Sequence, residues 1–543
     1  MDGIKVKITV KTLKISKSAI KIKIIAPKNI LKPTLYIQPR KNKEYSFTVL
    51  PSDSNNREVV FIFSLSNISP FNLYYDFYLE YQNEYGDYQF QRICNNSRRQ
   101  RQAINWLHLK YQTVINVRKK YLITAYFAVG GYLALQIRET DEYDAIRYKL
   151  KEVVALLLVP FVYWYYKDSK LIYEKFSNYA RDNSFYYFTY VQNNRKNKLF
   201  YIIKKDSPDI SNLSSFRKNI VYFMSVKHIL LIVISKYFIA SESKGHAYAW
   251  RHNQSIARFF LNKKPFVFLQ HGVLGLKKVD RTFFANNKLN HADLFITSSF
   301  VEKNIVLDYL GYDEKQVAVT GLARWDNGKQ IKKQKKIFIM PTWRTHLELL
   351  SHEEFLRSNF YKEYYNLIHS EILEDILCKY DYFLHFMMHP KFIQFEKYFT
   401  SSSDHIKVLY QDEHPLDEEL RSSELVITDY SSIMWDSLYY NIPTLLFQFD
   451  QEEYLNLQGS YLNMEKDLSK IVVLDADSLL QKIKAFIVKN DTPEIMSYHM
   501  KYFTFYDAEN SKRIDEAVRS WEEEFQFIPL LKKLLRRKSK NGR

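Results

Sequence analysis

The fold of this chain is predicted most directly by residues 424–454, which read ELVITDYSSIMWDSLYYNIPTLLFQFDQEEY. A short β-type run over residues 425–428 is followed by a helical pattern that begins at Ser431. The Asn-Ile-Pro turn at 441–443 ends this helix before a second apolar strand over 444–449. The order strand, turn, helix, strand is typical of a parallel α/β sheet, in which ligands bind beyond the carboxyl ends of the strands.

The start of this helix offers groups that can bind an anion. Ser431 and Ser432 supply hydroxyls, and the first turn of a helix carries unpaired N–H groups at the positive end of its dipole. A phosphate would fit there. Because the same serines would also serve as ordinary helix caps, the local sequence leaves both interpretations open.

The composition indicates a protein of several domains with an anionic partner. A chain of 543 residues is too long for one ordinary core, which predicts about two to four domains. Its 79 Lys and Arg residues against 60 Asp and Glu residues give a net charge of +19. Such a charge favours nucleic acid, an acidic membrane surface or phosphate-rich substrates as partners.

Cysteine usage and the N-terminus both predict a cytoplasmic location. Cys94 and Cys378 lie far apart without metal-ligand spacing, so a disulfide framework or a zinc site is not expected. The first 27 residues alternate Lys with Ile and Val, which predicts strands and not a signal peptide.

Periodicity divides the chain into regions. Period-two runs separated by turn residues predict a small antiparallel β-sandwich at the start. The pattern after residue 95 is interpreted as helical, opening at 97–101 and continuing through the charged stretch at 117–120. Strands alternating with helices, among them strands over 199–203 and 294–297, then predict two Rossmann-like halves, joined by a lysine-rich linker over 327–336. The predicted regions are the all-β domain, 1–94; a helical connector, 95–168; a first α/β half, 169–330; a second α/β half, 331–520; and a basic tail, 521–543.

Two segments suit contact with a membrane surface. The apolar run over 153–166, VVALLLVPFVYWYY, is shorter than the about 20 residues that a spanning helix needs. Trp164 and the neighbouring tyrosines suit an interfacial position, and a buried helix is the alternative interpretation. The tail from Leu530, LLKKLLRRKSKNGR, would either adsorb to anionic lipid or stay solvated.

In the first α/β half, an apolar strand delivers His271 and Gly272 to its carboxyl end. Gly272 allows close approach of another backbone or a ligand, and Lys277 follows a few residues later. A histidine at such a strand end is expected to face a ligand. Asp182, earlier in the same half, fits a helix cap as well as a site.

The second half offers comparable strand ends. The run IFIMPTWR over 337–344 places Thr342 and Arg344 where a guanidinium could pair with two phosphate oxygens, and a surface salt bridge is the alternative for Arg344. The next predicted strand, over 382–387, leads to His389 and a proline.

These stretches, taken together, resemble the motifs of one enzyme family. They are EKFSNYARDN (174–183), the His-Gly pair at 271–272, VAVTGLARWD (317–326), PTWR (341–344), the His-Pro pair at 389–390, TDYSS with the helical Asp436 (428–436), and FYDAENSKRIDEAV (505–518). The chain thereby resembles the CDP-glycerol glycerophosphotransferase family, whose members build teichoic acids and related phosphate-linked polymers on bacterial surfaces. The resemblance covers about residues 170–515.

The chain departs from the family pattern at several positions. Ser177 and Ala508 stand where glycine is common, and Ala323 replaces a usual proline. After the His-Gly pair the family commonly has Thr-Pro-Leu-Lys, whereas this chain has VLGLK over 273–277. This last departure leaves the acceptor-lining residues open and points to a different acceptor.

The resemblance implies both a fold and a reaction. The fold is a pair of Rossmann-like domains around a cleft, the GT-B arrangement of glycosyltransferases. In the reaction, a hydroxyl of a lipid-linked or polymeric acceptor attacks the β-phosphorus of CDP-glycerol or CDP-ribitol, and CMP leaves. The choice between the two donors stays open, and we expect the enzyme on the inner face of the cell membrane, bound peripherally to anionic lipid.

Residue roles follow from this scheme. His271 is assigned as general base on the acceptor hydroxyl, and His389 as a catalytic residue at the diphosphate. The further donor- or phosphate-binding candidates are Thr342, Arg344, Asp429, Ser431, Ser432, Ser511 and Arg513, and the other candidates are Gly272, Lys277, Arg324 and Asp436. No DxD-type carboxylate cluster stands out, so no metal site is predicted, and Mg²⁺ is left open as a cofactor.

Two alternatives stand beside this prediction. The first is a GT-B glycosyltransferase that uses a nucleotide sugar in cell-envelope polysaccharide synthesis. The second is a non-catalytic basic protein that binds a membrane surface or nucleic acid. Because the sequence carries no RNP, zinc-finger or helix-turn-helix signature, nucleic acid is not expected as a partner.

Overall fold

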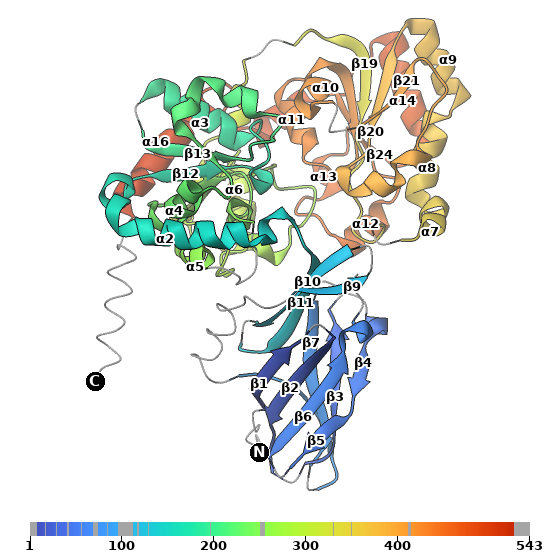
Figure 1. Ribbon diagram of the computed structural model, residues 1–543. Helices are drawn as coiled ribbons and strands as arrows, with labels where there is room; N and C mark the ends of the chain where they lie inside the picture. The colour runs from blue at the N-terminus through green and yellow to red at the C-terminus, as the bar shows by residue number, and fades with distance from the viewer. Residues whose placement is uncertain are drawn as a thin grey trace. The chain divides into compact units, whose positions relative to one another are not determined.

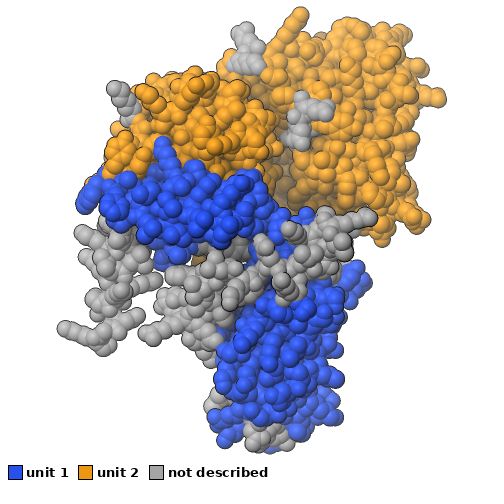
Figure 2. All heavy atoms as spheres, viewed as in Figure 1, with its two compact units in different colours: residues 1–164, 224–234, 248–263 blue, residues 165–223, 235–247, 264–543 orange. Residues whose placement is uncertain are grey.

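The computed structural model describes residues 8–16, 18–28, 30–40, 43–55, 57–68, 74–83, 85–95, 112–116, 119–128, 130–195, 197–249, 256–328, 331–348, 350–410 and 414–525. The chain divides into two compact units, which Figure 2 shows in different colours. The first unit comprises residues 1–164, 224–234 and 248–263, and the second unit comprises residues 165–223, 235–247 and 264–543.

The first unit begins with two antiparallel sheets that share one apolar core. One sheet has the order β1-β2-β6-β5, and the other has the order β4-β3-β7-β11-β10-β9, with β8 paired to β7 (Figure 1). Alternate residues of both sheets, such as Ile22, Phe61, Leu35 and Phe77, are fully buried in that core. The strands are β1 (Thr9–Ile15), β2 (Ala19–Ile25), β3 (Leu31–Pro39), β4 (Phe47–Val49), β5 (Pro51–Ser54), β6 (Glu58–Ser64), β7 (Tyr74–Gln82), β8 (Tyr88–Arg92), β9 (Gln112–Asn116), β10 (Lys119–Phe127) and β11 (Leu133–Glu139).

The predicted helical connector over 95–168 is wrong for residues 112–116, 119–127 and 133–139, which form strands β9, β10 and β11. Strands β10 and β11 form a hairpin with continuous pairing from Tyr121 opposite Glu139 to Phe127 opposite Leu133. Gly130 and Gly131, with φ of 86° and 80°, supply the left-handed backbone that this turn requires. Pairing across the sheet therefore decides the conformation, whereas the charged residues near 118 had suggested a helix. The predicted helix start at 97–101 lies outside the described residues.

The first α-helix after this hairpin is α2 (Ile146–Tyr166). The first unit also contains α4 (Val226–Ile234) and α5 (Ile256–Lys263). The buried Glu152 on α2 accepts a hydrogen bond from the backbone N–H of Ala257 at 3.0 Å, which fixes α2 to the start of α5. Within the described part of the chain, no helix has the length and apolar character needed to cross a membrane.

The second unit contains two α/β halves, each with its own parallel sheet. The sheet of the first half has the order β14-β13-β12-β15-β16-β17-β18. Strands buried on both faces, such as β12 and β13, explain the continuous apolar runs in the sequence. The elements are β12 (Lys170–Tyr173), α3 (Asn183–Asn194), β13 (Leu199–Ile203), β14 (Ile220–Tyr222), β15 (Phe238–Ala240), β16 (Phe266–Phe268), β17 (Leu294–Thr297), α6 (Phe300–Leu310) and β18 (Val317–Val319).

The sheet of the second half has the order β21-β20-β19-β22-β23-β24. Its strands are β19 (Gln334–Ile339), β20 (Phe383–Met387), β21 (Ile406–Leu409), β22 (Ser423–Thr428), β23 (Thr444–Phe447) and β24 (Val472–Val473). Its helices are α7 (His352–Arg357), α8 (Asn359–Ile368), α9 (Glu371–Tyr380), α10 (Leu416–Ser422), α11 (Ile433–Tyr439), α12 (Gln451–Leu457), α13 (Met464–Asp467), α14 (Ala476–Lys489) and α15 (Met496–Tyr502). The prediction of an α/β fold with two parallel sheets and an all-β part before them is confirmed.

Each parallel sheet has a topological switch point. In the first half β12 lies between β13 and β15, and in the second half β19 lies between β20 and β22. The chain leaves each of these central strands in one direction and later returns to build the other side. Residues that follow β12, β15, β19 and β22 are therefore the ones expected to contact ligands.

Helix α16 (Asn510–Glu524) packs on the first half although it follows the second half in the sequence. Ile514, Val518 and Trp521 belong to the core formed by β12, β13 and α3, and α16 lies beside α3 in Figure 1. The predicted boundary of the second half at residue 520 therefore includes a helix that packs elsewhere. The predicted basic tail begins inside α16, and its residues 526–543 lie outside the described part of the chain.

Candidate functional site

His271 lies at the carboxyl edge of the first sheet in an unusual backbone environment. The residue before it, Gln270, has a positive φ of 63° and is almost fully buried. The Gln270 side chain donates to the Ile296 carbonyl at 2.6 Å, and its own carbonyl accepts from Asn183 Nδ2 at 2.8 Å. This costly backbone conformation presents the His271 ring outward, where 64% of the side chain is exposed.

A carboxylate holds the His271 ring. Nδ1 of His271 lies 2.8 Å from Asp182 Oδ2, and Glu242 Oε1 lies 3.9 Å from the same nitrogen. Desolvation lowers the pKa of His271, but the hydrogen bond with Asp182 and the charges of Asp182 and Glu242 outweigh it, so the pKa lies above its ordinary value. The exposed Nε2 is then the nitrogen available to a substrate.

Asp182 is itself fixed by its surroundings. It caps α3 by accepting from the Asn183 N–H at 2.8 Å, and Arg324 Nη1 donates to its other side at 3.0 Å. The buried Glu174 accepts from the backbone N–H groups of Arg181, Asp182 and Phe185, and burial with the nearby Asp182 raises the Glu174 pKa to about 7. Both carboxylates belong to the sequence motif EKFSNYARDN over 174–183. The motif predicts a family resemblance and a helix cap, but it does not predict the contact of Asp182 with His271.

Two predicted candidates, Arg324 and Asp436, pair with each other across the two halves. Arg324 Nε and Nη2 donate to the Asp436 carboxylate at 2.8 and 3.0 Å, and Trp325 Nε1 donates to it at 2.8 Å. Arg324 Nη1 also donates to the His271 carbonyl at 2.8 Å. Arg324 therefore connects the His271 loop of the first half to α11 of the second half, which is a positioning role.

Gly272 brings His271 close to the serines of the second half. A Cβ atom at Gly272 would lie 2.4 Å from Ser432 Oγ, so only glycine permits this approach. Ser432 precedes α11 but makes no side-chain cap, and Ser431 Oγ accepts from the Ile433 N–H at 3.4 Å. That Ser431 and Ser432 belong to the same site as His271 stays a proposal. The close approach of Gly272 to Ser432 supports it.

Arg344 occupies a position that does not suit its predicted contact with phosphate. Its side chain is 1% exposed, and it donates to Asp450 through Nε at 2.8 Å and Nη2 at 3.1 Å. Nη1 lies 2.9 Å from Asp429 Oδ2 and donates to the Thr342 carbonyl at 2.8 Å. The rings of Tyr430 and Tyr454 cover the guanidinium at 4.8 and 5.0 Å. Arg344 and Asp429 thus form a buried charge network that shapes the strand ends.

Thr342, whose carbonyl accepts from Arg344, has a side-chain hydroxyl that no described residue hydrogen-bonds. Its backbone N–H donates to Asp429 Oδ1 at 2.8 Å, whereas its buried Oγ1 has no hydrogen-bond partner among the described residues. A buried hydroxyl without a protein partner is uncommon, and it can still donate or accept a hydrogen bond. The Thr342 hydroxyl is therefore a better candidate for ligand contact than the guanidinium of Arg344.

His389 lies near a group of cations. Desolvation, followed by the charges of Lys175, Lys277 and Lys391, lowers the pKa of His389 to about 4. Its Nδ1 accepts from the Lys391 N–H at 3.2 Å, which leaves Nε2 as a donor in the neutral ring. Neutral histidine beside several lysines is an arrangement that suits a bound anion.

Ser511 and Arg513 attach α16 to the first half. The backbone N–H of Ser511 donates to Asp326, and Arg513 donates to the Thr320 carbonyl at 3.0 Å and to Asp507 at 2.7 and 2.8 Å. Gly321, with φ of 82°, accommodates the side chain of Asn510 at the same place. These contacts explain the family motif at 505–518 through packing and do not include a polar group directed at His271.

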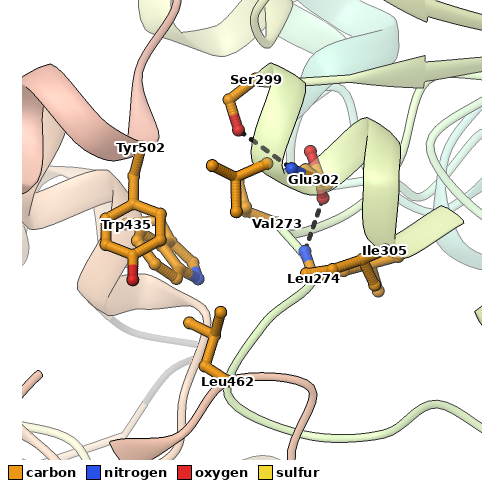
Figure 3. A pocket seen from close by; sticks show the side chains of 9 residues that line it. Val273, Leu274, Ser299, Glu302, Ile305, Trp435, Leu462 and Tyr502 are labelled. Atoms are coloured by element: carbon orange, nitrogen blue, oxygen red, sulfur yellow. Dashed lines mark hydrogen bonds between the residues drawn. The ribbon is translucent and has the colours of Figure 1, made fainter. Parts of the chain in front are cut away.

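The loop after the His-Gly pair packs against the second half. Figure 3 shows Val273 and Leu274 opposite Trp435, Leu462 and Tyr502, where they line a small apolar pocket (Figure 3). The turn is closed by Leu274 N–H, which donates to the carboxylate of Glu302. Val273 and Leu276 are 7% and 2% exposed. In the stretch that departs from the family pattern, Val273, Gly275 and Leu276 are thus buried, and Leu274 is half-buried.

Within the described ranges, no group of three or more His, Cys, Asp or Glu side chains is arranged to hold a metal ion. The polar groups that approach one another at the strand ends are instead imidazoles, hydroxyls, carboxylates and lysines.

The fold and site define a protein with two parallel α/β halves whose strand ends combine a histidine–aspartate pair with a cation-rich region. Residues 158–520 match the family described as CDP-Glycerol:Poly(glycerophosphate) glycerophosphotransferase, and the chain belongs to this family. The predicted family is therefore confirmed.

Individual relatives are similar at lower identity. The minor teichoic acid biosynthesis protein GgaB of Bacillus subtilis (strain 168) is 28% identical over 365 residues, covering 62% of this chain and 38% of that protein. The teichoic acid poly(ribitol-phosphate) polymerase of Bacillus spizizenii is 23% identical over 278 residues, covering 47% of this chain and 41% of that protein. The matched regions span less than half the length of these relatives. A structure of the wall teichoic acid polymerase TagF, H548A, has a TM-score of 0.49 at 17% identity and covers 70% of this chain and 98% of that chain.

Proposed function

We propose that this protein transfers a polyol phosphate, glycerol phosphate or ribitol phosphate, from a CDP-activated donor to an acceptor hydroxyl and releases CMP, as a step in teichoic acid or capsular polymer synthesis. The observation that carries this proposal is the His271–Asp182 pair at the carboxyl edge of the first sheet, next to Ser432 of the second half. Membership of the family supports the choice of a CDP-linked donor. The two halves would face each other across the substrates in a GT-B arrangement.

The proposed acceptor chemistry uses His271 as general base. Asp182 accepts a hydrogen bond from Nδ1–H of His271, which leaves the lone pair of the neutral ring on Nε2. Nε2 takes the proton of the acceptor hydroxyl while the oxygen forms a bond to the β-phosphorus of the donor. The bond between that phosphorus and the bridging oxygen breaks, and the electron pair leaves with CMP. Arg324 keeps Asp182 oriented during this step because it also pairs with Asp436.

The proposed donor chemistry uses the second half. His389 is neutral near pH 7 because its pKa is about 4, so its Nε2–H can donate to a phosphate oxygen. The hydroxyls of Thr342, Ser431 and Ser432 complete the set of second-half groups assigned to the diphosphate, and Lys277 of the first half lies near His389. Arg344 and Asp429 act indirectly, because their pairing holds the loop that carries Thr342.

Donor identity tests this function directly. We expect the wild-type protein to release CMP from CDP-glycerol or CDP-ribitol when a membrane extract supplies the acceptor. The measurement is chromatographic quantification of CMP, with UDP- and GDP-sugars assayed in parallel. Turnover of a nucleotide sugar without turnover of either CDP-polyol would instead establish the alternative glycosyltransferase.

We also propose that α2 binds an anionic membrane surface. One face of this helix exposes apolar side chains at intervals of three or four residues, among them Leu150, Leu157, Phe161 and Trp164 at 59%, 67%, 83% and 74%. Cations on and beside the helix, including Arg147, suit anionic lipid, and an apolar helix face with flanking cations and a terminal Trp is typical of interfacial helices. The opposite face, with Glu152, packs within the first unit.

Charge placed on this helix face should weaken lipid binding. We expect the Leu157→Glu/Phe161→Glu variant to bind phosphatidylglycerol-containing vesicles at least about tenfold more weakly, because each buried apolar side chain contributes about 1.5–3 kcal/mol. Flotation with the full chain measures this binding. The control is Ile372→Glu on α9, which alters an equally exposed apolar residue elsewhere (61% exposed). Equal flotation of the wild type, the Leu157→Glu/Phe161→Glu variant and the Ile372→Glu control would exclude α2 as the membrane contact.

A further inference from the structure

Glu242 is a carboxylate at the candidate site to which sequence analysis assigned no role. It follows β15, which lies directly beside the central strand β12 at the switch point of the first sheet. Its side chain is 14% exposed, and Oε1 lies 3.9 Å from Nδ1 of His271. The fold thus brings a second carboxylate to the ring that Asp182 holds.

The two carboxylates, Asp182 and Glu242, differ in the cations that they contact. Asp182 divides its charge between His271 and Arg324, and it also caps α3. Glu242, in contrast, has His271 as its one cationic neighbour within 4 Å among the residues that the structure describes. Glu242 also accepts no hydrogen bond from that part of the chain. No other cation within 4 Å among these residues therefore competes with His271 for the Glu242 carboxylate.

We propose that Glu242 is a positioning residue for the proposed reaction, whose carboxylate stabilises the imidazolium that His271 becomes when it takes the acceptor's proton. This inference rests on the function proposed above. The charged or titratable groups that face His271 are Asp182 on α3, Glu242 after β15, Arg324 on η9 (Ala323–Asp326) and His389 from the second half. Of the two anions, Asp182 holds the ring directly and shares its charge with Arg324, whereas Glu242 has no other cation within 4 Å among the described residues.

Removing the charge of Glu242 should shift both the His271 pKa and the pH profile of kcat/KM in one direction. A neighbouring anion favours protonated histidine, so removing the charge of Glu242 lowers the pKa of His271. Because the base must be neutral to act, the acid limb of the kcat/KM profile then moves to lower pH. The plateau rate falls, because a weaker base accepts the acceptor's proton less readily.

The test compares Glu242→Gln, Glu242→Asp and a control, Glu314→Gln, in the full chain. Glu314 is 78% exposed and pairs with Lys303, away from His271. The His271 pKa is measured by NMR on protein labelled at histidine Cε1, with the signal assigned by its absence in His271→Gln. We expect the pKa to fall by about one unit in Glu242→Gln, to fall less in Glu242→Asp, and to stay unchanged in Glu314→Gln.

Turnover is measured on the same proteins. We expect Glu242→Gln to lose about tenfold in plateau kcat/KM for CMP release, with an acid limb displaced by the same amount as the NMR pKa, and Glu242→Asp to recover part of both. An unchanged His271 pKa, or a changed pKa with an unchanged pH–rate profile, would overturn the inference. Absence of turnover in the wild type would overturn the proposed function, and the NMR result would still decide whether Glu242 and His271 are coupled.

Discussion

Replacing His271 by alanine should reduce acceptor-dependent CMP release by about 10²- to 10⁴-fold, the usual contribution of a general base. The ring is exposed at Nε2 and held at Nδ1 by Asp182, so its removal takes away the proton acceptor without disturbing a buried core. The measurement is CMP release at saturating donor concentration with the donor identified for the wild type. Binding of that donor, measured by calorimetry, should change little because the donor is assigned to the second half.

The matched control for this prediction is His369→Ala. His369 is an exposed histidine at the end of α8, where it stacks on Tyr365. We expect this variant to retain wild-type turnover. If His271→Ala retains activity within about threefold, proton transfer to His271 is not needed, because a general base supplies at least about 10²-fold. The pair of His271 and Asp182 would then have a structural role.

Replacing Arg344 by alanine should lower the free energy of unfolding of the second α/β half by about 3–5 kcal/mol, because the two buried carboxylates Asp429 and Asp450 lose their partner. The sequence suggested instead that Arg344 contacts phosphate, with a surface salt bridge as the alternative. Urea unfolding followed by tryptophan fluorescence measures the change.

The control for the second prediction is Arg357→Ala, at an exposed arginine of α7 whose loss should change stability by at most about 0.5 kcal/mol. A variant that neutralises the whole network, Arg344→Met with Asp429→Asn and Asp450→Asn, should recover part of the lost stability, because no uncompensated charge remains. Unchanged unfolding of Arg344→Ala together with weaker binding of CDP would restore the predicted role as a phosphate ligand.

Much of the fold of the second unit was predictable from local patterns. The predicted strands over 199–203 and 294–297 coincide with β13 and β17, and the strand, turn and helix after residue 424 became β22 and α11. Parallel strands are continuous apolar runs ended by polar turns, so their boundaries are encoded within a few residues. The same logic failed over 112–139, where β10 and β11 form only because each pairs with a partner strand.

The candidate site was predictable in part. His271 was identified because a strand end delivers it to the edge where ligands bind, and the structure places its ring there, outward and exposed. Arg344 satisfied the same local criterion but is buried, because Asp450, more than a hundred residues later, reaches it from the end of β23. Glu242 carried no motif at all, and only the pairing of β15 with β12 brings it to His271.

The sequence by itself determined the family, the two parallel sheets and the strand ends at which polar residues gather, since these depend on periodicity and short motifs. The tertiary structure decided which of those polar residues bind one another and which stay available. It paired Arg324 with Asp436, enclosed Arg344 between two carboxylates, and packed α16 on the first half. The physical reason is that the energy of a charge depends on its burial and its nearest opposite charge, and both are set by segments distant in the sequence.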